Sequence, residues 1–449
     1  MKPIYITLSL FVLILLPCRE VVGEERLEVF QHTTVSSSPN PVGSGARAMG
    51  MGGAFIAVAD DATAASWNPA GLTQLRKPEI SIVYSHFSRS EDLDLSNHPE
   101  SSASPSVSSD DLNYLSIVYP FTLCQRNMTV SLNYQLLYEF KNNINFNYNE
   151  VFLGQQWKKT FDIKQDGQLR TLSPAYAIQV TPRLSLGITF NFWTDNLFWS
   201  NGWTTEKTET AKTYGRFPLL GIENKWLQER YTDFSGFNMN FGFLWNINKF
   251  LTLGAVLKTP FTAHVNYKSA NNSSTFSFPP LVLTKPLVTK TRDNVDLNMP
   301  LSYGFGVACR FSDAFTMSLD IYVTDWSNYI LETSKGQRYS LITAESSRDS
   351  HVKDTTQVHL GGEYLFILTN TVIPVRGGLF YDPEPAEGHP QDFWGFSLGS
   401  GISIKNIILD CAYQYRHGNN AGKQNLTGFP DAKADVTQHL FLASVIYHF

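Results

Sequence analysis

Serine and histidine side chains could together hydrolyse lipid esters, because a histidine base can activate a serine hydroxyl as a nucleophile. The candidate bases are His264, His351, His359, His417, His439 and His448. No spacing in the sequence places one of them beside an activated serine and a third group that orients the imidazole. We therefore predict no catalytic residues, and an esterase stays as the alternative from another functional class.

A glycine-rich stretch near the N-terminus could in principle bind the phosphates of a nucleotide. Its glycines are Gly43, Gly45, Gly50, Gly52 and Gly53. The G-x-G-x-x-G spacing is absent, and no predicted strand leads into the stretch. Glycine also lets two backbones approach closely. We therefore expect Gly45, Gly50, Gly52 and Gly53 to serve in close packing, together with Phe55. We expect no cofactor.

The cysteines show no metal-ligand pattern. Cys124, Cys309 and Cys411 remain once Cys18 is removed with a predicted export signal. An odd and widely spaced set gives neither a disulfide framework nor a zinc-type spacing. We expect free thiols and no metal site.

Composition bounds the class of protein. The 449 residues would make about three soluble domains at ~150 residues each. Charged residues are only 17% of the chain and aromatic residues 13%, with a mean hydropathy of −0.17. Alternating lipid-facing and water-facing residues in a transmembrane β-barrel average to such values. The net charge of −5 gives no basic footprint for nucleic acid.

The first residues predict an export signal. Lys2 supplies a positive charge, Ile4–Leu16 forms an apolar stretch, and Val21-Val22-Gly23 offers small residues for cleavage. Residues 1–23 are therefore a predicted signal peptide. No run after Pro17 is long and apolar enough for a transmembrane helix.

Alternation with a period of two dominates from Pro78 onward. Thr129–Phe140 places apolar and aromatic residues on one face and mostly polar residues on the other. Leu184–Phe192 and Phe315–Thr324 repeat this pattern. One face suits lipid and the other suits water. The same register puts the thiols of Cys309 and Cys411 on the lipid-facing side.

This template predicts about fourteen strands, an even number typical of bacterial single-chain barrels. They are 78–88, 111–120, 127–141, 168–180, 183–195, 231–246, 250–268, 298–311, 314–330, 352–366, 371–382, 391–403, 405–417 and 436–449. Short connections such as Thr181-Pro182, Ile247–Lys249 and Ser312-Asp313 alternate with long polar ones. The long ones are 89–110, 142–167, 196–230, 269–297 and 331–351.

Short periplasmic turns and long extracellular loops are typical of the bacterial outer membrane and place both termini in the periplasm. Several soluble β-sandwiches would also alternate. They would not explain aromatic residues near strand ends, such as Phe190, Phe192 and Trp193, or a chain that stops within an amphipathic strand. Tyr447 and Phe449 on that last strand are the predicted signal for the outer-membrane assembly machinery.

Residues 24–77 lack the alternation. Gly45–Val58 is rich in Gly and Ala, and Asp61–Trp67 predicts a short helix that Pro69 stops. The segment is too small to hold a core of its own. We expect an all-β fold, a transmembrane antiparallel β-barrel of about fourteen strands over 78–449, with 24–77 as an N-terminal extension and a hatch that plugs the lumen.

Parts of the sequence resemble the FadL/TodX family of outer-membrane transporters for long-chain fatty acids and hydrocarbons. The similarity covers Gly45–Phe55 and Trp67–Leu72 in the hatch, and Phe241–Phe261, Pro300–Trp326 and Val375–Asp382 in the barrel. The resemblance implies a plugged fourteen-stranded barrel that takes hydrophobic molecules from outside and releases them sideways into the outer membrane, without a cofactor.

The resemblance also implies site residues. Asn68, Pro69 and Ala70 match the NPA motif of the family's hatch, whose displacement accompanies passage of ligand. The family's exit is a kink in the third strand. Here Met128–Phe140 has neither Gly nor Pro, and only Leu137 interrupts its polar face.

Three lumen-side arginines could bind the carboxylate headgroup of a fatty acid: Arg310, Arg376 and Arg416. Inward-facing charges in barrels usually pair with neighbours, here Asp320 or Asp410. The expected function is passive diffusion of hydrophobic molecules, above all long-chain fatty acids, with outer-membrane lipid as the receiving phase. The alternative is a non-transporting barrel of the same family that acts as a docking or assembly protein in secretion.

Overall fold

A computed structural model describes residues 43–449 except 96–97, 99–100, 153–154, 196, 215–220, 278–281, 285–286 and 422–431. The predicted signal peptide 1–23 and the extension up to residue 42 lie outside the described residues. None of the described helices is long and apolar enough to cross a membrane.

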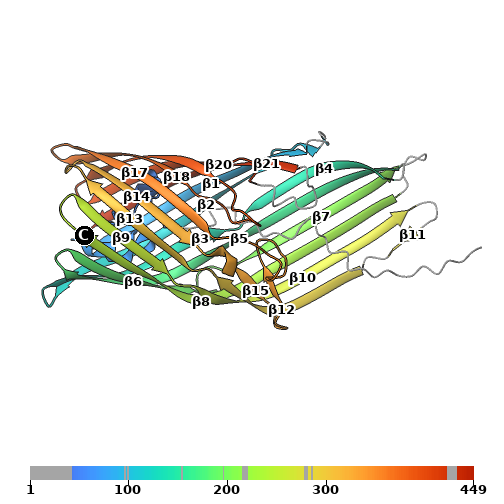
Figure 1. Cartoon of the computed structure of the whole chain (residues 1–449), viewed down its shortest axis with the longest axis horizontal. Coiled ribbons are helices and arrows are strands. Elements are labelled where there is room, and N and C mark those ends of the chain that lie inside the picture. Colours follow the sequence, from blue (N-terminus) through green and yellow to red (C-terminus); the bar gives the residue numbers. More distant parts are fainter. Residues whose placement is uncertain are drawn as a thin grey trace, which may run out of the picture.

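Within the described residues, fourteen antiparallel wall strands pair in a closed ring (Figure 1). They are β1 (Glu79–Leu95), β2 (Ser106–Leu123), β3 (Arg126–Glu139), β5 (Gln155–Thr181), β6 (Leu184–Trp193), β8 (Gly221–Asn246), β9 (Leu251–Lys258) with β10 (Phe261–Ser277), β12 (Leu287–Met299) with β13 (Ser302–Arg310), β14 (Phe315–Thr324), β17 (Thr355–Ile367), β18 (Thr371–Tyr381), β19 (Trp394–Ile404), β20 (Ile407–Gly418) and β21 (Ala432–His448). The last strand pairs with the first over seventeen residues. The predicted barrel and its strand number are confirmed.

Two of the wall strands are broken by proline. Pro260 separates β9 from β10, and Pro300 separates β12 from β13. Proline has no N–H to give to a ladder, so the pairing is interrupted there. The two halves still follow one course, because β9 pairs with β13 and β10 pairs with β12.

The two faces of the wall differ as the alternation predicts. Along β2, Ile117 and Tyr119 are more than half exposed on the outer face, whereas Ser116 and Val118 are buried in the lumen. In water this outer apolar surface would be unfavourable, but lipid removes that cost. Cys309 and Cys411 are both free thiols in the structure, and Cys411 is exposed on the outer face with Leu409.

Strands continue into most of the ranges expected to be long polar connections, so the connections themselves are shorter than predicted. Residues 142–167 contain β4 (Asn142–Phe152) and the start of β5, and 196–230 contain β7 (Gly202–Tyr214) and the start of β8. Together with β10 and β12 they extend the wall away from the short-turn end, which lies on the left in Figure 1. The short connections expected after residues 181, 246 and 311 are turns between strands.

A third kind of connection folds back toward the barrel interior. Between β14 and β17 the chain forms η4 (Trp326–Asn328), β15 (Ile330–Glu332) and β16 (Arg338–Ser340). β15 pairs with β12, and Trp326, Leu331 and Leu341 are buried. The half of the lumen away from the short-turn end is therefore partly filled by this segment.

A closed barrel leaves no strand edge open to unfolding by detergent. We expect the protein to stay folded in cold SDS and to migrate faster on a gel when unboiled than when boiled. Equal mobility of the two samples would contradict closure of β21 on β1.

Candidate functional site

The hatch, residues 43–77, lies inside the barrel. It contains α1 (Ala46–Gly50), α2 (Ala64–Trp67) and the 3₁₀ helix η2 (Pro69–Gln74). α1 contacts the β18–β21 side of the wall, and η2 contacts β5, β6 and β8. Phe55 and Trp67 are buried and meet edge to face at 5.8 Å between ring centroids. The hatch thus forms a packed floor rather than a loose loop.

Glycines of the wall let the backbone of the hatch approach directly. A Cβ added at Gly361 would lie 2.0 Å from the carbonyl oxygen of Met51, and one at Gly378 would lie 2.4 Å from the nitrogen of Gly52. Other wall glycines in such contact are Gly187, Gly242, Gly254, Gly306 and Gly399. These positions were not recognised in the sequence, because a glycine in a strand does not indicate what lies opposite it.

The predicted packing glycines of the hatch fit this picture. Gly45, Gly52 and Gly53 have positive φ angles of 113°, 68° and 79°, which non-glycine residues adopt only with strain. Gly50 faces Gly399, where an added Cβ would lie 3.0 Å from the opposing Cα.

Polar side chains of the wall bind the backbone of the hatch. The Asp320 carboxylate accepts hydrogen bonds from the N–H groups of Phe55 (2.6 Å) and Ile56 (2.7 Å). Asp320 therefore serves the hatch and not a neighbouring arginine. The ring of His359 contacts the carbonyl oxygen of Gly52 through Nδ1 at 2.6 Å. Buried backbone groups need such partners.

In the NPA motif, the side chain of Asn68 forms hydrogen bonds both within the hatch and to the barrel wall. The Asn68 side-chain amide donates to the carbonyl oxygens of Ile56 and Phe243, both at 2.9 Å. Its Oδ1 accepts from the N–H of Ala70 at 3.1 Å and so caps η2, with Pro69 at the first helical position. The motif thus joins two parts of the hatch to strand β8.

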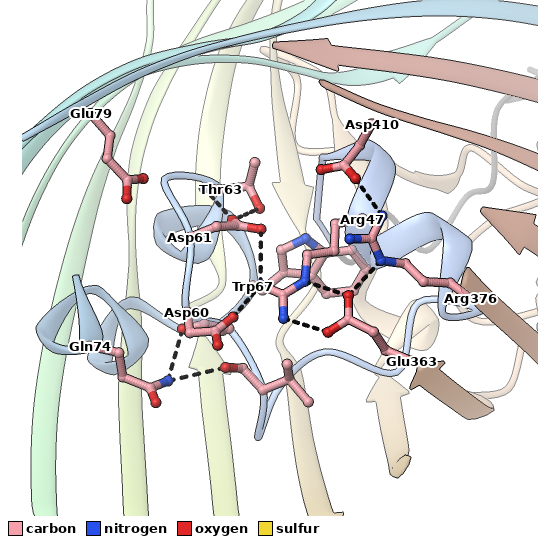
Figure 2. A network of polar contacts seen from close by, with 12 residues as sticks. Arg47, Asp60, Asp61, Thr63, Trp67, Gln74, Glu79, Glu363, Arg376 and Asp410 are labelled. Carbon is pink, nitrogen blue, oxygen red and sulfur yellow. Dashed lines mark hydrogen bonds and ion pairs between the residues drawn. The ribbon is translucent and has the colours of Figure 1, made fainter. Parts of the chain in front are cut away.

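An ion-pair network fixes α1 to the wall (Figure 2). Arg47 contacts Asp60 at 2.5 Å and Glu363 at 2.8 Å. Arg376 contacts the same Glu363 at 2.6 Å and Asp410 at 2.5 Å. Burial lowers the pKa of the Arg47 guanidinium, but the charges of Asp60 and Glu363 outweigh burial and hold that pKa well above its ordinary value. Burial raises the pKa of the Asp60 carboxyl, and Arg47 opposes this rise.

The three arginines predicted as headgroup contacts do not come together. Arg310 is exposed at the end of β13 beside the short turn to β14. Arg376 is buried in the network with Asp410, which was one of the two expected pairing partners. Arg416 is buried near the extracellular half, where it contacts Asp382 and Glu384.

Two neighbouring cavities lie within the lumen, and one of them borders the hatch. The hatch cavity, about 140 Å³, is bounded by hatch residues such as Gly52 and Trp67 and by wall residues such as His359 and Arg416. The aromatic cavity, about 50 Å³, is bounded by residues that include Trp193, Phe261 and Lys258. The residues that line both are Gln135, Leu137, Tyr138 and Gln357. The two cavities are therefore neighbours that share one wall.

An aromatic cluster leads from the extracellular extension to the aromatic cavity. Tyr231 stacks on Trp203 at 4.4 Å, and Trp203 stacks on Phe140 at 4.5 Å between ring centroids. Trp193 and Phe261, stacked at 5.4 Å, belong to the same cluster and line the cavity. These rings are largely buried and form one packed apolar cluster that reaches from β7 and β8 to the aromatic cavity.

The wall has a gap between β2 and β3. Their pairing runs from Leu123 and Arg126 to Tyr114 and Gln135, and among the described residues no further pair joins these two strands above that point. At this height β3 carries a bulge, because Leu137 has no partner in the register with β5. The interruption that Leu137 makes in the polar face was the visible sign of this bulge in the sequence.

The unpaired stretch between β2 and β3 borders the hatch cavity. Asn113 on the β2 side and Leu136 to Glu139 on the β3 side all line that cavity. Asn113 is itself the extra residue of a second bulge, in the register between β1 and β2. The Asp111 carboxylate accepts a hydrogen bond from Gln168 at 2.7 Å, which links β2 to β5 past the end of β3. The gap is therefore bordered by side-chain contacts rather than by a backbone ladder.

Comparison with known proteins gives a family and a fold. The family model described as outer membrane protein transport protein (OMPP1/FadL/TodX) matches residues 38–449. A FadL homologue of Pseudomonas aeruginosa has a TM-score of 0.58 at 13% identity, covering 91% of this chain and 98% of that chain. The Pseudomonas putida toluene transporter TodX gives 0.56 at 12%, with 91% and 98% covered.

A third solved structure, the CymD monoaromatic hydrocarbon channel, has a TM-score of 0.52 at 16% identity and covers 91% of this chain and 98% of that chain. At these identities the structural likeness shows a shared fold. A sequence comparison with curated proteins finds no match.

Gly361 and Gly362 give a matched pair on opposite faces of β17. Gly361→Ala should push Met51 and lower the free energy of unfolding by about 1–3 kcal/mol, the usual cost of overpacking. Gly362→Ala should be close to neutral, because its added Cβ would meet nothing nearer than 3.7 Å. Urea titration of both variants in lipid vesicles measures the difference. Equal stabilities would mean that the hatch does not press on β17.

Asn68→Ala leaves the carbonyl oxygens of Ile56 and Phe243 without their donor. We expect a loss of about 1–3 kcal/mol in the free energy of unfolding, as for other buried unsatisfied groups, and a larger ion conductance in planar bilayers. Gln74→Ala is the control, because that amide is only half-buried and makes longer bonds of 3.1 and 3.3 Å. A parent-like conductance and stability in Asn68→Ala would refute a fastening role for the motif.

Proposed function

Because the chain belongs to the OMPP1/FadL/TodX family of outer-membrane transport proteins, we propose that it conducts long hydrophobic molecules, above all long-chain fatty acids, by passive diffusion with lateral release. The family places the chain in the bacterial outer membrane and makes a hydrophobic small molecule its cargo. The observation that carries the proposal is the gap in backbone pairing between β2 and β3, which borders a cavity that the hatch also lines.

The proposed route has three stations. A ligand first enters the aromatic cavity, beside Trp193 and Phe261. It then moves through the aromatic cavity into the hatch cavity across the shared lining at Leu137 and Tyr138. It leaves through the gap into lipid, because Asn113 and Leu137 mark the two edges of that opening.

Burial of apolar surface supplies the affinity along this route. An apolar chain gains roughly 25 cal/mol for each Å² removed from water, so no energy source is needed for entry from water. Lipid offers the same gain at the exit. Two adjoining cavities suit an extended molecule better than a compact one, which supports a long chain as cargo.

The arginines contribute less to this proposal than the sequence suggested. Arg416 lines the hatch cavity and is the arginine of the three that remains a proposed headgroup contact. Its guanidinium already donates to Glu384, Gln438 and the carbonyl of Asp382. A carboxylate would have to compete with these partners.

The alternatives gain less support. The candidate bases contact acidic, amide, hydroxyl or carbonyl groups, such as Asp296 for His264 and Tyr413 for His439, an arrangement that does not assemble a serine nucleophile. A docking barrel would need neither an aromatic cavity nor an interruption of the wall beside a lumen cavity. No feature of the described residues favours it over transport.

Deleting Leu137 tests the exit. The deletion removes the extra residue of the bulge, so β3 should run straight against β5 and approach β2. We expect uptake of radiolabelled oleate by cells to fall to the level of cells without the protein. Leu137→Ala is the control, because it keeps the backbone of the bulge and should retain uptake. If the deletion variant is folded at parent levels and takes up oleate normally, the ligand leaves elsewhere.

A further inference from the structure

His359 connects the hatch cavity to the hatch. It stands on β17, is 5% exposed and stacks on Phe380 at 5.8 Å between ring centroids. Its Nδ1 lies 2.6 Å from the carbonyl oxygen of Gly52. A carbonyl oxygen only accepts hydrogen bonds, so Nδ1 carries the proton. The other ring nitrogen, Nε2, is then the acceptor of the neutral imidazole.

That acceptor has no partner. Nε2 of His359 is buried and makes no hydrogen bond to any described residue, while His359 lines the hatch cavity. A buried acceptor left without a donor costs free energy comparable to a lost hydrogen bond. A ligand that brings a donor to this place would recover it.

The charges around the cavity favour a neutral donor over an anion. Arg416 is the arginine or lysine among the described lining residues, and it is engaged by Asp382 and Glu384. Glu139 and Asp382 also line the cavity. A carboxylate ligand would therefore meet acidic groups and a guanidinium that is already bound.

We propose that Nε2 of His359 accepts a hydrogen bond from an O–H group of the ligand, and that the hatch cavity therefore selects long-chain alcohols and fatty acids in their neutral acid form. The inference rests on the proposed transport function and names the ligand chemistry of the same cavity. His359 is a specificity-determining residue, and the bond from its Nδ1 to Gly52 holds the ring in place for this contact.

The test is displacement of tritiated 1-dodecanol from the purified full-length protein in detergent at pH 8. The competitors are unlabelled 1-dodecanol, its methyl ether and dodecanoate. The alcohol and the ether share one apolar chain, but the ether has no O–H. We expect the alcohol to displace about tenfold better than the ether, the ratio that corresponds to one hydrogen bond, and better than ionised dodecanoate.

Two substitutions separate the nitrogens of the ring. The amide nitrogen of asparagine is as many bonds from Cα as Nδ1, so His359→Asn can keep the bond to Gly52 while it removes the acceptor. The amide oxygen of glutamine is as many bonds from Cα as Nε2, so His359→Gln can keep the acceptor. We expect the alcohol preference to vanish in His359→Asn and to persist in His359→Gln. His439→Asn on the outer face is the matched control, and gel mobility of unboiled samples checks folding.

The outcomes separate the inference from the function. If alcohol and ether bind equally to the parent, if the preference survives in His359→Asn, or if dodecanoate binds tightest, the inference is wrong while transport stands. If neither alcohol nor ether binds the parent and oleate uptake is also absent, the proposed function fails together with it.

Discussion

The rest of the structure depends on one constraint, which is that the polar backbone groups of the hatch must be satisfied inside the barrel. A folded segment placed inside a barrel must bury its own N–H and C=O groups against a wall whose backbone is already paired. Glycines such as Gly361 and Gly378 provide the space for this approach. Side chains such as Asp320 and Asn68 provide the hydrogen bonds. The closed floor of the channel follows from both.

The same constraint explains how the buried charges are used. Arg47 and Arg376 share Glu363, and Asp410 completes the set. An ion removed from water needs well-placed partners to offset its desolvation, and these groups are placed to fasten α1. Charges that hold the hatch are not available to a ligand. Arg416 does line the cavity, but it is itself bound by Asp382 and Glu384.

The sequence was sufficient to predict those features of the fold that depend on a single strand and on the solvent at its two faces. Alternation in segments such as Thr129–Phe140 predicted the barrel because lipid and lumen impose opposite faces. The strands of the extension were missed because polar residues occupy both of their faces; β7, for example, has no apolar stripe in its sequence. The contacts of Gly361 and His359 were missed because they depend on hatch residues about 300 positions away. Leu137 marked an irregularity, but only the pairing of β3 located the gap.

The placement of the gap bears on how much of the hatch must move. The glycine contacts, Asp320 and the Arg47 network all fasten the hatch to the wall, so shifting the hatch as a body would break many contacts at once. A sideways exit at Asn113 and Leu137 requires no such shift. The turn at Gly52 is one of the parts of the hatch that line the cavity, and His359 contacts it. A small movement of that turn would change the shape of the cavity while the floor stays closed, so ligand passage and the seal against water need not compete.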